Sequence, residues 1–132
     1  MKKASVIIIL FLSFLMFSGK QADQTQGKSL YEKYCLSCHQ ADGNGVRGMF
    51  PPLAGNQIII GPPDTLIRIV LLGLEGPIEV NGATYDQVMP SQDYLKDPEI
   101  AAILTYLRST WGNNAAPVNA DAVSRERQST VK

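Results

Sequence analysis

The chain has 132 residues, with twelve basic and twelve acidic side chains, so its formal net charge is zero. A chain of this length fits a single domain. Because the charges balance and no basic run occurs, the composition excludes the electrostatic pattern typical of nucleic-acid-binding proteins.

Residues 1–22 have the composition of an export signal. Lys2 and Lys3 precede an apolar run from Val6 to Phe17, which is shorter than the about 20 apolar residues that a membrane span needs. We therefore predict that residues 1–22 are a signal peptide and that the protein is exported. Retention of this segment as an N-terminal anchor is the alternative, because residues 18–22 lack a clean cleavage pattern.

A first helix is predicted from about residue 25 through residue 39. One helical face is formed by Gly27, Tyr31, Tyr34 and Cys38. The helix ends in Cys35-Leu36-Ser37-Cys38-His39, which contains both cysteines and the sole histidine of the chain. This spacing is the signal for covalent haem attachment, in which both thiols form thioethers with the haem. His39 is then placed to ligate the iron as the proximal axial ligand.

Other roles of a Cys-x-x-Cys pair fit this chain less well. A structural zinc site takes four Cys or His ligands, and the chain has three in total. A thioredoxin-like dithiol lies at a strand-to-helix junction, yet no β-branched apolar run precedes Cys35. A simple disulfide would leave His39 unexplained.

The middle of the chain predicts a loop, a helix and a hairpin. Residues 41–55 are dense in turn residues and prolines, which indicates a long loop. A second helix is predicted from Pro62 and Pro63 to about Leu72. Residues 78–85 alternate around Asn81-Gly82, the pattern typical of a two-stranded hairpin.

Asp97-Pro98-Glu99 is typical of a helix start. Apolar residues follow at helical spacing as far as Trp111, and Gly112 is predicted to end the helix. No sustained period follows, so we predict that residues 114–132 form a loosely ordered C-terminal tail. The predicted domain therefore comprises residues 23–113.

A haem iron bound by His39 has a sixth position that this sequence cannot fill with a second histidine. Methionine is the leading candidate. Two of the four methionines fall within residues 1–22, which leaves Met49 and Met89. Met89 is favoured because it arrives from a separate segment after the hairpin. Its alternative role is to fill a gap in the core.

Together these features resemble the class I cytochromes c of small bacterial type, over roughly residues 25–113. The matching motifs are Cys35-Leu36-Ser37-Cys38-His39, Pro51-x-Leu53-x-Gly55, Met89-Pro90 and the closing segment from Thr105 to Asn113. The resemblance implies an all-α fold, with three to four helices around one covalently bound haem c and a short β-hairpin before Met89. It also implies a close crossing of the first and last helices, onto which Gly27, Tyr31, Ile103 and Tyr106 map.

The resemblance further implies roles for residues around the haem. The Pro51 carbonyl would accept a hydrogen bond from the second ring nitrogen of His39, although a proline is also a common turn residue. Leu53 would pack on the haem. Candidate contacts to the haem propionates, each of which also fits a surface or core role, are Asn56, Arg68, Tyr85 and Trp111.

With His39 and Met89 as axial ligands, the implied function is single-electron transfer between Fe(III) and Fe(II) rather than enzymatic catalysis. The implied partners are an oxidase, a reductase or a dehydrogenase, which dock transiently or include this chain as a subunit. The implied location is the periplasm or the outer face of the cytoplasmic membrane, with membrane contact only if residues 1–22 are retained. One rival is a haem enzyme or gas sensor with a labile Met89. Another is a colourless dithiol or metal-binding module without haem.

Overall fold

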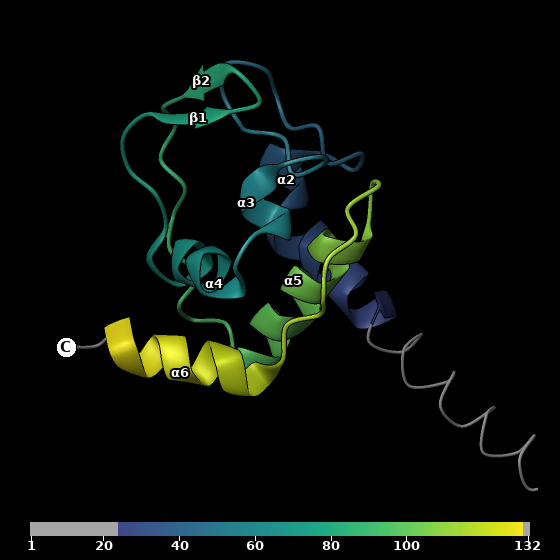
Figure 1. Ribbon diagram of the computed structural model, residues 1–132, viewed down its shortest axis with the longest axis vertical. Helices are drawn as coiled ribbons and strands as arrows, with labels where there is room; N and C mark the ends of the chain where they lie inside the picture. Colours follow the sequence, from purple (N-terminus) through teal and green to yellow (C-terminus); the bar gives the residue numbers. More distant parts are fainter. Residues whose placement is uncertain (1–23, 131–132) are drawn as a thin grey trace, which may run out of the picture.

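The computed structural model describes residues 24–130, so the predicted export signal at residues 1–22 lies outside the described residues. Residues 24–34 are helical. The elements that follow are α2 (Leu36–His39), α3 (Gln57–Ile60), α4 (Pro63–Leu72), β1 (Ile78–Val80), β2 (Ala83–Tyr85), α5 (Asp97–Ser109) and α6 (Ala120–Thr130) (Figure 1). Within the described range, none of the helices is both long and apolar enough to cross a membrane.

The helix at residues 24–34 crosses α5 at Gly27. A Cβ atom on Gly27 would overlap the carbonyl oxygen of Ala102 and would lie 2.8 Å from the Cβ of Tyr106. One turn further along, the ring of Tyr31 packs on that of Tyr106 with 5.6 Å between centroids. The missing side chain of Gly27 therefore lets the two backbones meet. The predicted crossing of the first helix with the helix that contains Tyr106 is confirmed, although α6 follows that helix in the chain.

The second helix and the hairpin form where the sequence predicts them. Helix α4 buries an apolar face and leaves Arg68 exposed. Strands β1 and β2 pair antiparallel, with Ile78 opposite Tyr85. Asn81 and Gly82 between them have φ values of 51° and 76°, and positive φ at both central residues is what a type I′ hairpin turn requires.

The C-terminal end of α5 differs from the prediction. The helix ends at Ser109, Thr110 is extended, and Trp111 has a φ of 52°. The side-chain Nδ2 of Asn113 points back to the helix and donates to the carbonyl of Leu107 at 2.8 Å. This side chain takes the place of a further helical turn, so Trp111 leaves the helix instead of continuing its apolar face.

The prediction of a loose tail at residues 114–132 is wrong over residues 114–130, the part of it that the structure describes. Residues 120–130 form α6, which packs across α4 and α5 (Figure 1). Its Val123 is 0% exposed and belongs to the core. The helix is tied by charged side chains, with Arg68 of α4 donating to Glu126 at 2.6 Å and Arg127 donating to Asp97 of α5 at 2.7 Å. Because one valine and ion pairs anchor α6, it has no apolar stripe that periodicity could detect.

Replacing Val123 with alanine tests whether α6 is part of the folding unit. We expect Val123→Ala to lower the free energy of unfolding by about 2 kcal/mol, since two buried methyl groups are lost and a cavity is left. Gln128→Ala, on the exposed side of α6, should change it by less than about 0.5 kcal/mol. Chemical denaturation of the haem-loaded protein measures both. Equal stability of the two variants would show that α6 contributes nothing to the core.

Candidate functional site

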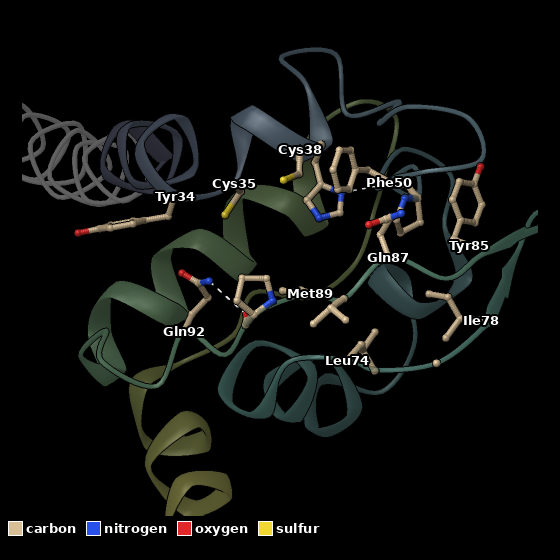
Figure 2. Close-up of a pocket in the computed structure, with 15 residues that line it drawn as sticks. Tyr34, Cys35, Cys38, Phe50, Leu74, Ile78, Tyr85, Gln87, Met89 and Gln92 are labelled. Carbon is tan, nitrogen blue, oxygen red and sulfur yellow. Dashed lines mark hydrogen bonds between the residues drawn. The ribbon is translucent and has the colours of Figure 1, made fainter.

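Cys35 lies at the junction between the first helix and α2, and Cys38 lies within α2. Cys35 and Cys38 are free thiols, each partly buried, and both line one cavity (Figure 2). Burial, with a smaller contribution from the neighbouring Cys38, raises the pKa of the Cys35 thiol to about 11. The turn is fixed by Tyr31, whose hydroxyl donates to the carbonyl of Gln40 at 2.6 Å. Burial raises the pKa of Tyr31, which keeps this donor protonated.

His39 is oriented by the loop that follows it. Its Nδ1 lies 2.9 Å from the carbonyl oxygen of Pro51. A carbonyl oxygen can only accept, so Nδ1 carries the proton and Nε2 keeps a free lone pair. Burial lowers the pKa of His39, while the Pro51 hydrogen bond opposes that shift. The imidazole is therefore neutral at pH 7, which is the form that binds a metal.

The loop at residues 40–55 is held from two directions. Its own backbone turns on Gly43, whose carbonyl accepts from the amides of Leu53 at 2.7 Å and Ala54 at 3.0 Å. From the other end of the chain, buried Asn113 donates to the carbonyl of Leu53 at 3.0 Å and accepts from the amide of Gly55 at 3.0 Å. Asn113 is a positioning residue that the sequence does not reveal, because its partners lie about 60 residues away in the chain.

Met89 reaches the cavity on a segment fastened to the end of α4. Its backbone exchanges two hydrogen bonds with Leu74, at 2.9 and 3.0 Å. Gly73 makes this pairing feasible, because a Cβ at that position would overlap the carbonyl oxygen of Met89. Cys38 and Met89 approach the same space from different walls (Figure 2). Met49, the other candidate, is 46% exposed and lines neither described cavity.

Two adjoining cavities, of about 100 and 80 Å³, share much of their walls. Residues common to both are Cys35, His39, Pro51, Leu74, Ile78, Met89 and Gln92. Leu53 lines the second cavity together with apolar residues of α3, α4 and α5. Two thiols that can form thioether bonds to a haem, with an imidazole nitrogen and a thioether sulfur that can ligate its iron, in apolar surroundings, are the groups of a c-type haem site. The residues present therefore fit that group.

The four candidate propionate contacts are not brought together. Arg68 is paired with Glu126 on the outside of α4, and Trp111 donates to the carbonyl of Ala41 at 3.1 Å. Asn56 lines the second cavity, but its amide caps α3 at Ile58. Tyr85 lines the first cavity, and within the described part of the chain its hydroxyl has no hydrogen-bond partner. Tyr85 is the candidate that the geometry favours.

Gln92 is a cavity residue that no sequence motif indicates. It lines both cavities, and its Nε2 donates to the carbonyl of Pro90 at 3.2 Å. Its Oε1 accepts from the hydroxyl of Tyr94 at 2.6 Å. The side-chain amide of Gln92 is therefore hydrogen-bonded to Pro90, the residue that directly follows Met89 (Figure 2).

Comparison with known proteins agrees with this geometry. Residues 24–111 match the family model for cytochrome c. A cytochrome c-552 of Thermus thermophilus is 42% identical over 106 residues, which cover 77% of this chain and 71% of that protein. The cytochrome c subunit of the quinone-dependent alcohol dehydrogenase of Gluconobacter oxydans is 38% identical over 112 residues, 83% of this chain and 23% of that subunit. The fructose dehydrogenase cytochrome subunit of Gluconobacter japonicus is 38% identical over 108 residues, 78% of this chain and 22% of that subunit.

Proposed function

Since this chain belongs to the cytochrome c family, whose members are electron-transfer haem proteins, we propose that it carries a single haem c as a one-electron carrier. Cys35 and Cys38 would hold the haem covalently. His39 and Met89 would be its axial ligands. The observation that carries the proposal is the convergence of these four side chains on one apolar cavity.

Each of these residues has a defined task in that site. His39 presents Nε2, because Pro51 holds Nδ1 as a donor. Met89 presents a thioether from a backbone pinned to Leu74. Leu53 and the other apolar wall residues exclude water. The bound haem supplies one-electron chemistry between Fe(III) and Fe(II), and a thioether ligand favours the reduced state.

Two protein ligands would leave no coordination position for a substrate, which favours electron transfer over catalysis. The rival, an enzyme or sensor with a labile Met89, predicts that the reduced protein binds carbon monoxide rapidly. Slow or undetectable binding supports the carrier. Rapid binding by the wild type would contradict it.

The names of two relatives suggest the class of redox partner, and the pattern of residues 1–22 suggests the location. Two relatives are cytochrome subunits of an alcohol dehydrogenase and a fructose dehydrogenase, although the chain spans only about a quarter of each. We propose that a dehydrogenase, a reductase or an oxidase exchanges electrons with this protein through transient docking. We also propose that residues 1–22 direct export to the periplasm or to the outer face of the cytoplasmic membrane, in agreement with the basic and apolar pattern of that segment.

Mass measurement tests the covalent attachment and the haem count directly. The chain, expressed with haem-attachment machinery and denatured, should weigh one haem more than its polypeptide. Trypsin cleaves after Lys33 and Arg47, so the peptide 34–47 holds both cysteines and His39. We expect the added mass on that peptide alone. A denatured mass equal to that of the bare polypeptide would overturn the proposal.

A further inference from the structure

Residues 89–97, here called the ligand strap, connect Met89 to the start of α5. Three strap residues line the second cavity, namely Met89, Gln92 and Leu95. Any motion of the strap away from the cavity would therefore carry the Met89 sulfur with it.

The first half of the strap is tied to α4. Besides the pairing of Met89 with Leu74, the hydroxyl of Ser91 donates to the carbonyl of Leu71 at 2.6 Å. The amide of Gln92 donates to the carbonyl of Val70 at 2.9 Å. Val70 and Leu71 belong to the last turn of α4, and Leu74 lies two residues beyond its end.

The second half of the strap is tied to α6 by one side chain. The guanidinium of Arg127 donates to the carbonyl of Asp93 at 2.6 Å, to the carbonyl of Leu95 at 2.6 Å and to the carboxylate of Asp97 at 2.7 Å. An arginine can meet three acceptors at once because its five donors lie in one rigid plane. Its side chain is about a quarter exposed, so these charged bonds are only partly screened.

Helix α6 is also fixed to α4, through the ion pair between Arg68 and Glu126. It therefore braces both the helix that anchors the start of the strap and the strap itself. This helix lies beyond residues 24–111, the range matched by the family model. The motifs that supply the haem ligands do not include it.

We propose that Arg127 is a positioning residue for the sixth ligand, which keeps the strap closed and so holds the Met89 sulfur at the iron. The inference rests on the proposed function, in which Met89 is that ligand. Loss of Arg127 should favour an open strap with Met89 detached, because the three bonds exist only in the closed form.

Imidazole is the probe, since it binds the ferric iron only when Met89 is off, and its apparent affinity rises with the fraction of open strap. We expect Arg127→Ala to bind imidazole about tenfold more tightly than the wild type, as charged hydrogen bonds are lost from the closed state alone. The amides of Met89 and Gln92 should also exchange hydrogen faster. Arg127→Gln serves if the alanine variant yields too little folded protein.

Two controls separate positioning from general destabilisation. Arg125→Ala removes the same charge from the exposed side of α6, where this arginine has no ion pair or hydrogen bond to the described residues, and it should bind imidazole as the wild type does. Val123→Ala weakens the core without touching the three bonds, and its imidazole affinity should stay within about twofold of the wild type. If the imidazole affinity rose as much in Val123→Ala as in Arg127→Ala, the effect of Arg127 would be one of general stability and the proposed positioning role would be refuted.

Met89→Leu, measured in parallel, distinguishes the two ways of failing. If it binds imidazole no more tightly than the wild type, Met89 is not the ligand and the proposed ligation falls. If it binds more tightly while Arg127→Ala matches the wild type, the ligation stands and the role of Arg127 is refuted.

Discussion

Met89→Leu should keep its covalent haem and lose the methionine-dependent absorption band at the red end of the ferric spectrum. Leucine matches methionine in volume, and such exchanges cost less than about 1.5 kcal/mol in a core. The substitution replaces the unbranched thioether with a branched hydrocarbon of similar volume, so the sulfur donor is lost. Its midpoint potential should fall by on the order of 0.1 V, within the about 0.8 V that axial ligands span, because the thioether that stabilises Fe(II) is lost.

Met49→Leu is the matched control for this experiment. Met49 lies in the loop on the His39 side and is 46% exposed, so both the band and the potential should match the wild type. Spectra and a redox titration read both variants. A Met89→Leu protein with an unchanged band would mean that Met89 fills space only, which is the alternative that its sequence position leaves open.

Gly27→Ala should destabilise the protein, which is the opposite of what helix propensity alone predicts. In an exposed helix the change would stabilise by about 1 kcal/mol. At this crossing the new Cβ would overlap the Ala102 carbonyl oxygen and approach the Cβ of Tyr106. Neither is the end of a flexible side chain, so the two helices must separate. Overpacking costs about 1–3 kcal/mol, and overlap with two rigid atoms places this site at the upper end. After the propensity gain of about 1 kcal/mol is subtracted, we expect a net loss of about 2 kcal/mol.

Thermal unfolding of the haem-loaded protein measures this loss. For a domain of about 100 residues, a loss of about 2 kcal/mol lowers Tm by roughly 8 °C or more. Ser29→Ala, on the exposed side of the same helix, should leave Tm nearly unchanged. If Gly27→Ala melted at or above the wild-type temperature, the close approach at Gly27 would not limit the packing of these helices.

Local patterns in the sequence were enough to predict the first helix, α4, the hairpin and the start of α5. In each case the determining residues are neighbours in the chain, such as Asn81 and Gly82 in the hairpin turn. The contact between His39 and Pro51 was implied only by the family resemblance, and the structure contains that hydrogen bond. That this hydrogen bond orients His39 as an iron ligand is part of the proposed function.

The features that the sequence did not predict depend on contacts between distant segments. Asn113 binds the loop near Leu53 across 60 residues, and Arg127 binds Leu95 across 32. The spacing of apolar residues along the sequence contains no sign of such a contact. Helix α6 was missed for the same reason, because its polar residues acquire partners only when α4 and α5 are in place.

The pairing of Leu74 with Met89 closes residues 75–88 into a loop whose two ends are pinned together. Changes of length or composition at the tip of the hairpin, around Asn81 and Gly82, therefore need not shift the methionine. Ile78 and Tyr85, which pair at the base of the hairpin, line the first cavity. The contacts that anchor Met89, the proposed ligand, are thus separate from the hairpin residues that line the cavity beside it. Evolution or design can therefore change the hairpin while leaving the anchoring of Met89 alone.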